Sequence, residues 1–264
     1  MTKPFKADVL VVKLSGKALT ADKALDALFT TLAGSAASAE RTRVVLVHGG
    51  GVEVDALMRG LGRRIDRIEG LRVSPAEDMA VIAGTCSLKL RGAAQRAGLM
   101  PLGLCATDAG IGRVVPADPR LGRVGVIEPG DSAAKRRLQA LLDAGFTPVI
   151  SSVGMDAAGA LWNINADDAA VASAALLGAP LIFLSDVPGV LDANKHLFEQ
   201  LNEEQAETLI AEGVISGGMT VKVRAAFRAA AMTGKPVAAA SVFDPMLPNK
   251  LASGQLPGTT FTLE

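Results

Sequence analysis

Short runs of apolar residues alternate along the chain with longer segments in which apolar side chains recur every three or four positions. Runs such as VVLV at 44–47 and LIFL at 181–184 are apolar throughout, as expected for strands that are covered on both faces. The longer segments have the period of helices. This alternation predicts a mainly parallel sheet between helices, which binds ligands beyond the carboxyl ends of its strands.

The boundaries follow from the same pattern. The predicted strands cover 9–14, 44–47, 99–104, 147–152, 181–185, 236–241 and 260–263. The predicted helices cover 21–33, 51–61, 75–97 with Gly84 as a weak point, 131–144, 166–177, 202–212 and 218–233. Residues 112–127 predict a hairpin, because two Val/Ile-rich arms flank Pro and Asp. The 264 residues contain no repeat or flexible linker, which favours one large domain or two closely joined lobes.

Charge and cysteine content exclude several classes of protein. Lys+Arg and Asp+Glu both number 27, so no net charge favours nucleic acid or an anionic membrane surface. Cys86 and Cys105 form no C-x-x-C spacing and predict small buried side chains rather than a disulfide or zinc site. The first residues lack an apolar signal segment, and no apolar run is long enough for a bilayer. We therefore expect a cytoplasmic protein.

Two glycine-containing turns follow two predicted neighbouring strands. Lys13 lies near the end of the first strand, before Ser15-Gly16, and His48 with three glycines follows the second. Three consecutive glycines cost backbone entropy, which indicates close approach of the backbone to an anionic or carbonyl oxygen. A tight strand-to-helix turn is the alternative, and G-x-G-x-x-G, the dinucleotide fingerprint, is absent. His48 is predicted to be structural.

Four later segments carry polar residues at predicted strand ends or helix starts. GLRVS at 70–74 offers Arg72, whose guanidinium could grip a carboxylate. In LWNINADDAA at 161–170, Asn165 or Asp167 could cap the helix, while Asn163 and Asn165 alternate and could face a polar ligand together. LIFLSDVPGVLD at 181–192 and GVISGGMTVKVRAA at 213–226 supply a carboxylate at a strand end and a lysine among apolar neighbours.

The chain resembles the amino acid kinase family, and within it the acetylglutamate kinases. The resemblance lies in six segments that occur in this order: KLSG, VHGGG, GLRVS, NINADDAA, LSDVPGVLD and GGMTVKV. The resemblance covers nearly the whole chain. It implies a three-layer α/β/α sandwich with a mainly parallel central sheet of about eight strands. It also implies one amino acid kinase domain over 1–264. In that domain a lobe of about 1–160 binds the acyl acceptor and dimerises, and a lobe of about 161–264 binds ATP.

The activity that the resemblance implies is phosphorylation of the side-chain carboxylate of N-acetyl-L-glutamate by ATP, the second step of arginine biosynthesis. Because that carboxylate is ionised near pH 7, it needs no general base. Catalysis would depend on positioning and on charge stabilisation around the transferring phosphoryl group. Mg²⁺ would be held largely by phosphates and water, with no metal ligands from the protein.

The resemblance also assigns roles to single residues. Lys13 would neutralise charge on the transferring phosphoryl group, Lys222 would do so on the leaving-group side, and Asp167 would hold both lysines. The acceptor site would comprise Gly50, Gly51, Arg72 and Asn163, joined by Asn165 because it alternates with Asn163. The nucleotide site would comprise Gly16, Asp186, Val187, Pro188, Gly189, Val190, Leu191, Val214, Ile215 and Ser216.

Some features depart from the family pattern. Ser15 stands where acetylglutamate kinases usually have glycine, as in the uridylate kinase branch, although VHGGG, GLRVS and NINAD fit the acetylglutamate type. Lys17 adds a charge close to the phosphate loop, and the resemblance assigns no role to this lysine. Arginine-inhibited members carry an extra N-terminal helix, and this chain starts shortly before its first strand. A homodimer that arginine does not inhibit is therefore expected.

Two alternatives stay open. The acceptor could be a longer acetylated amino acid such as N-acetyl-aminoadipate, because one methylene changes binding by only ~1–3 kcal/mol. A non-catalytic sensor could share the fold. Such a sensor would be free to lose Lys13, Asp167 and Lys222, so their presence favours an enzyme.

Overall fold

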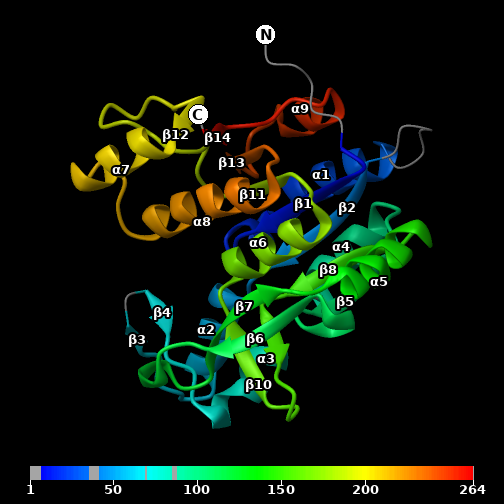
Figure 1. The fold of residues 1–264 in the computed structure, drawn as a ribbon, viewed down its shortest axis with the longest axis vertical. Helices are drawn as coiled ribbons and strands as arrows, with labels where there is room; N and C mark the ends of the chain where they lie inside the picture. The colour runs from blue at the N-terminus through cyan, green and yellow to red at the C-terminus, as the bar shows by residue number, and fades with distance from the viewer. Residues whose placement is uncertain (1–6, 36–41, 69, 85–87, 264) are drawn as a thin grey trace.

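The computed structural model describes residues 7–35, 42–68, 70–84 and 88–263, and Figure 1 shows the path of the chain. Within these residues the largest sheet has eight strands in the order β12-β14-β13-β11-β1-β2-β8-β5. These strands are β1 (Val9–Leu14), β2 (Arg43–His48), β5 (Pro101–Cys105), β8 (Thr147–Ser151), β11 (Leu181–Ser185), β12 (Gln200–Asn202), β13 (Val237–Ser241) and β14 (Thr259–Thr262). All neighbours are parallel except β13 and β14. The predicted mainly parallel sheet is confirmed.

Helices cover both faces of this sheet, which confirms the three-layer fold. One face packs against α1 (Asp22–Ser35), α4 (Leu88–Arg96) and α9 (Leu247–Ala252), and the other against α5 (Ser132–Asp143), α6 (Ala166–Leu177) and α8 (Gly218–Thr233). In β1, Val9 and Val11 join the α6 side, whereas Leu10, Val12 and Leu14 join the α1 side. Every residue of β1 is buried, because successive side chains enter opposite layers.

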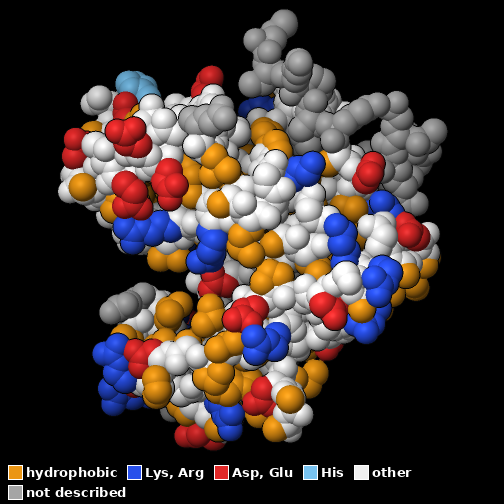
Figure 2. Space-filling model, viewed as in Figure 1, with side chains coloured by type: hydrophobic (Ala, Val, Ile, Leu, Met, Phe, Trp, Pro, Cys, Tyr) orange, Lys and Arg blue, Asp and Glu red, His pale blue; other side chains and the backbone are white. Residues whose placement is uncertain are grey.

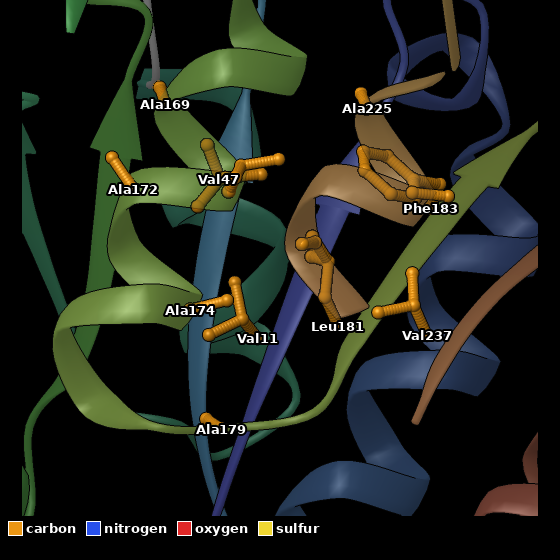
Figure 3. Close-up of a cluster of buried hydrophobic side chains, with 14 of the residues drawn as sticks. Val11, Val47, Ala169, Ala172, Ala174, Ala179, Leu181, Phe183, Ala225 and Val237 are labelled. Atoms are coloured by element: carbon orange, nitrogen blue, oxygen red, sulfur yellow. The ribbon is translucent and has the colours of Figure 1, made fainter. Parts of the chain in front are cut away.

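Helix α6 lies close against the centre of the sheet because its buried face consists mostly of alanine. Figure 3 shows Ala174 of α6 beside Val11 of β1, and Ala169 and Ala172 belong to the same buried cluster. Small side chains let the helix axis approach the strands closely, while each buried Val or Leu contributes roughly 1.5–3 kcal/mol. The first turn of α6 is thereby fixed at the carboxyl ends of β1 and β2.

A second, four-stranded sheet has the order β6-β7-β10-β9. Its strands are β6 (Gly112–Pro116), β7 (Val124–Pro129), β9 (Val153–Met155) and β10 (Leu161–Ile164). The β6–β7 pair is antiparallel and confirms the predicted hairpin, but β9 and β10 were not predicted as strands. A smaller hairpin joins β3 (Arg67–Ile68) and β4 (Leu71–Arg72). In Figure 1 these strands lie beside α2 (Gly51–Gly60) and α3 (Met79–Gly84), at the lower end of the view.

The stretch of 75–97, predicted to be helical with Gly84 as a weak point, is helical over most of its described residues. A 3₁₀ turn covers Ala76–Asp78, α3 covers Met79–Gly84, and α4 covers Leu88–Arg96. Residues 85–87, including Cys86, lie outside the described residues. Cys105 is half-buried, and burial raises the pKa of its thiol.

Several smaller elements were also missed or displaced. Strand β5 begins at Pro101 rather than at 99, and β12 and α9 were not predicted. Helix α7 (Glu203–Ala211) confirms the predicted helix at 202–212, with Asn202 and Gln205 forming a capping box. Among the helices of the described residues, none combines the length and apolar character required to span a membrane.

Candidate active site

A pocket of about 280 Å³ lies at the carboxyl ends of β1 and β2, against the second sheet and the β3–β4 hairpin. Figure 2 shows the molecule hollowed between the part that carries α7 and α8 in Figure 1 and the part that carries β3 and β4. Residues from six segments line the pocket: Lys13, Gly16, Gly49–Gly51, Val54, Arg67, Gly70–Arg72, Ile82, Ser152, Val153 and Asn163–Ala166. The structure thus brings together all the predicted acceptor residues with Lys13 and Gly16.

Lys13, which lines this pocket, forms a deeply buried ion pair with Asp167. Lys13 Nζ lies 2.6 Å from Asp167 Oδ1, and the two side chains are 9% and 12% exposed. Asp167 is fixed in the first turn of α6, where its N–H donates to the side chain of Asn165 at 2.9 Å. The helix N-terminus favours the carboxylate. Lys13 therefore presents a positive charge to the pocket from a rigid strand end.

Lys222 approaches the same charges from α8, which follows the left-handed turn at Gly217 (φ 58°). Burial lowers the pKa of Lys222, and the like charge of Lys13 lowers it further, whereas Asp167 and Asp186 oppose this shift. Lys222 therefore lies within electrostatic range of Lys13, Asp167 and Asp186. Two lysines and two carboxylates from four separate segments gather at one edge of the sheet.

Arg72 is buried beside Asp55, a residue of α2 that the sequence analysis did not select. Asp55 pairs with Arg72 and accepts a hydrogen bond from Arg67 at 2.6 Å. Arg72 also donates to the Gly51 carbonyl at 3.1 Å. Burial tends to raise the pKa of Asp55, but its bonds to Arg67 and Arg72 outweigh burial and hold that pKa below its ordinary value. Asp55 remains ionised and fixes the guanidinium of Arg72 at the pocket wall.

Replacing Asp55 by asparagine should raise KM for the acceptor about tenfold, the size expected for one lost charged hydrogen bond, with a smaller change in kcat. Arg72 would keep its charge but lose its fixed orientation. Steady-state kinetics with the acceptor varied would measure this split. Asp66→Asn is the matched control, because Asp66 pairs with the exposed Arg64. A pure loss of kcat in Asp55→Asn would contradict a positioning role.

The two asparagines of the predicted site make different contacts. Asn163 donates from Nδ2 to the buried Ser74 hydroxyl at 3.0 Å, and Ser74 in turn donates to the Arg72 carbonyl at 3.2 Å. Asn165 caps α6, which confirms the structural alternative for that residue. Both also line the pocket, so the expected alternation holds. Asp168, the last of the cluster, pairs with Arg228 of α8 instead.

The predicted nucleotide segments lie apart from this pocket. Asp186 to Leu191 follow β11, and Val214 to Ser216 precede α8. Val190 and Ile215 are 1% and 2% exposed, so their side chains belong to the core and only their backbone could face a ligand. Val190 N–H donates to Thr259 Oγ1 at 2.9 Å. At Gly189 (φ 149°), a Cβ would lie 2.4 Å from the same hydroxyl, so only glycine fits.

A second pocket of about 330 Å³ lies beyond the carboxyl ends of β11 and β13. It is lined by Pro188, Leu197, Ser241, Phe243, Asp244, Lys250 and Gly258. Of these residues, only Pro188 was predicted. The residues that follow β13 carry no motif in the sequence, so their proximity to Pro188 could be found only from the parallel pairing of β11 with β13.

His48 ends β2 but does not line the pocket at the ends of β1 and β2. The residue is 1% exposed, and its Nδ1 lies 3.3 Å from the Gly49 carbonyl oxygen. Burial lowers the pKa of His48 to about 4, so the ring is neutral at neutral pH. This environment agrees with the predicted structural role. Across the described residues, no group of three or more His, Cys, Asp or Glu side chains is placed to bind a metal ion.

The model of the amino acid kinase family matches residues 8–240. The chain belongs to the amino acid kinase family. Curated relatives agree along the full length: the acetylglutamate kinase of Vibrio vulnificus (strain YJ016) is 44% identical, with 99% of each chain covered. That of Aeromonas salmonicida (strain A449) is 45% identical, with 96% of this chain and 98% of the relative covered. The protein is therefore a kinase.

Solved structures share this fold. The structure of smu.665 from Streptococcus mutans UA159 has a TM-score of 0.79 at 25% identity and covers 97% of this chain and 99% of its own. N-acetylglutamate synthase from Neisseria gonorrhoeae, complexed with coenzyme A and N-acetyl-glutamate, has a TM-score of 0.81 at 23% identity. This chain spans 60% of that protein, and the likeness shows a common fold.

Proposed function

We propose that this amino acid kinase transfers the terminal phosphoryl group of ATP to the side-chain carboxylate of N-acetyl-L-glutamate. The products would be ADP and N-acetyl-L-glutamyl 5-phosphate, a step of arginine biosynthesis. One observation carries the proposal: the Lys13–Asp167 pair, Arg72, Asn163 and the glycine turn meet around a single pocket. The full-length similarity to acetylglutamate kinases supports the choice of acceptor.

Arg72 is proposed to bind the α-carboxylate of the acceptor. Its guanidinium is held by Asp55 and Gly51 and lines the pocket, so little side-chain entropy is lost when a carboxylate binds. Asn163 would bind a polar group at the acetylated amino end of the acceptor, because Ser74 orients the side-chain amide of Asn163. Gly50 and Gly51 would allow the backbone to approach the acceptor closely. This arrangement would point the side-chain carboxylate towards Lys13.

The chemistry we propose needs no proton transfer. The attacking carboxylate is ionised at neutral pH, so the protein's task is to bring two anions together and to neutralise the charge that develops between them. Lys13 would stabilise the transferring phosphoryl group, and Lys222 would act on the leaving-group side. Asp167 would keep Lys13 in position without contacting the substrate. Gly16 and Gly50 would direct backbone amides at the phosphoryl oxygens.

The nucleotide is proposed to lie across the carboxyl ends of β11 and β13, against the segments 186–191 and 214–216. In this proposal the lobe of about 161–264 binds ATP and the lobe of about 1–160 binds the acceptor. Mg²⁺ would accompany ATP, where it supplies positive charge to the phosphates, and would be held mainly by phosphate oxygens and water. In this structure Asp167 and Asp186 are each paired with a lysine.

The assignment predicts ADP release from Mg-ATP with N-acetyl-L-glutamate, and an acylphosphate that hydroxylamine traps as a hydroxamate. Purified protein would be assayed in parallel with N-acetyl-L-aminoadipate, free glutamate and UMP. Turnover with another of these acceptors, and not with N-acetyl-L-glutamate, would show that the proposed acceptor is wrong. If folded protein, checked by circular dichroism, turned over none of these acceptors, the hypothesis of a non-catalytic sensor would be favoured over the proposed activity.

A further inference from the structure

Lys17 forms an ion pair that joins the two turns on either side of the proposed phosphate path. Its Nζ lies 2.8 Å from Asp186 Oδ2, although 169 positions separate the two residues. Lys17 belongs to the turn after β1, and Asp186 follows the last residue of β11. Because β1 and β11 are adjacent parallel strands, both turns emerge at the same edge of the sheet. The pair therefore lies where a nucleotide phosphate chain would run towards Lys13.

Ser15, the residue that departs from the family pattern, fixes the turn that carries Lys17. The Ser15 N–H donates to the Leu184 carbonyl at 2.9 Å, and its hydroxyl accepts a hydrogen bond from the Ala18 N–H at 3.2 Å. The Lys17 carbonyl accepts from both the N–H and the hydroxyl of Thr20. Ser15 thus ties the turn to β11 and closes it. The backbone of Lys17 is held in place, whereas its side chain is exposed and held only by Asp186.

The Lys17–Asp186 contact is exposed and therefore exchangeable. The side chains are 70% and 35% exposed, in contrast to the deeply buried pair of Lys13 and Asp167. Water screens an exposed pair, and ordering two side chains cancels much of the attraction, so such contacts contribute little to stability. A triphosphate carries several negative charges where Asp186 carries one. A lysine in this position would transfer to the phosphates at little cost to the fold.

We propose that Lys17 is a third phosphate-binding lysine, which leaves Asp186 and binds the terminal phosphates of ATP when the nucleotide enters. The inference rests on the proposed function for the identity of the nucleotide, but not on the identity of the acceptor. In this proposal the buried Lys13 and the half-buried Lys222 reach the phosphates from within the protein, whereas Lys17 approaches from the solvent side. Its affinity contribution should therefore grow with the number of phosphates on the nucleotide.

The test is calorimetric titration of the full-length protein with Mg-ATP, Mg-ADP and AMP. Lys17→Ala should raise Kd for Mg-ATP about tenfold, raise Kd for Mg-ADP less, and leave Kd for AMP unchanged. Lys17→Arg should retain most of the affinity for Mg-ATP, because the charge is kept. Lys23→Ala is the matched control, an exposed lysine in α1. Lys17→Ala should also flatten the dependence of ATP affinity on salt concentration.

Asp186→Asn separates phosphate binding from a purely structural contact. If the pair only holds the two turns together, Lys17→Ala and Asp186→Asn would weaken ATP, ADP and AMP by similar factors, which would overturn the proposal. Unchanged Mg-ATP affinity in Lys17→Ala would also overturn it. Lys17-dependent ATP binding without turnover of N-acetyl-L-glutamate would refute only the proposed acceptor. Wild-type protein that binds no Mg-ATP would refute both proposals together.

Discussion

Replacing Lys222 by alanine is expected to lower kcat by ~10²–10³-fold, the loss typical of removing one group that stabilises transition-state charge. Lys222 is half-buried within electrostatic range of Lys13, Asp167 and Asp186, and its charge is disfavoured in the free protein. Such a lysine is poised to gain from an incoming negative charge. Lys13→Ala is a less clean test, because it leaves the buried carboxylate of Asp167 without its partner. Steady-state kinetics and a thermal melt of Lys222→Ala would give the result.

The pH dependence gives this prediction a second readout. Burial and the charge of Lys13 lower the pKa of Lys222 from 10.5, so its proton is lost at a lower pH than that of an ordinary lysine. The value of kcat/KM for Mg-ATP should therefore fall as pH rises through that lowered pKa. Lys222→Arg should move this fall to higher pH, because arginine stays protonated. Lys235→Ala, at an exposed lysine after α8, is the control. Near-normal turnover of Lys222→Ala would refute charge stabilisation by this residue.

The layered fold could be predicted from the sequence because its strands are short, apolar and separated by helices. β1 shows why: VLVVKL has no polar face, so it had to lie between two layers, and its neighbours follow the same logic. The strands of the second sheet could not be read in this way. LWNI of β10 and VGM of β9 are short, half-buried and stabilised by pairing with each other and with β7. Their strand character comes from tertiary contacts rather than from periodicity.

In the candidate site, too, some residues could be predicted from local sequence patterns, whereas others depend on tertiary contacts. Lys13 and Asp167 could be selected from the sequence because each sits in a motif at an element boundary, and the structure brings them together. Asp55 could not be selected, because an acidic residue in a helix that begins with three glycines resembles a solvated side chain. Its partner Arg67 lies in β3, a two-residue strand whose packing against α2 no local pattern encodes. A polar residue buried inside an otherwise apolar helix face is the signal that could have identified Asp55.

The nucleotide segments show a limit of motif matching. The motif LSDVPGVLD selected residues 186–191 as a unit, but the side chain of Val190 is buried while Asp186 is exposed and paired with Lys17. A motif therefore marks where the backbone turns, and only the packing shows which side chains face outward.

The expected homodimer stays a prediction, which light scattering of the purified protein would check.

Asp167→Asn is the second substitution for which we expect a large effect, a decrease in kcat of ~10²-fold. Asp167 does not line the pocket, but its Oδ1 lies 2.6 Å from Nζ of Lys13, which does. Asparagine has nearly the same shape and can still accept a hydrogen bond, but it removes the negative charge between the two lysines. Lys13 would then be buried without a counter-charge, a condition that costs about 3–5 kcal/mol unless the group loses its proton.

Asp168→Asn supplies a control on the neighbouring residue of the same helix turn. Asp168 pairs with Arg228, away from Lys13, and burial raises the pKa of its carboxyl, so neutralising it should leave kcat near the wild-type value. In Asp167→Asn, Lys222 also loses a charge that raises its pKa, so the alkaline fall in kcat/KM should move to lower pH. Equal loss of activity in both variants would show that the effect comes from disturbing the structure at the start of α6 and not from the charge of Asp167. Loss in Asp167→Asn alone, with the pH shift, would locate the effect in the charge that organises the two lysines.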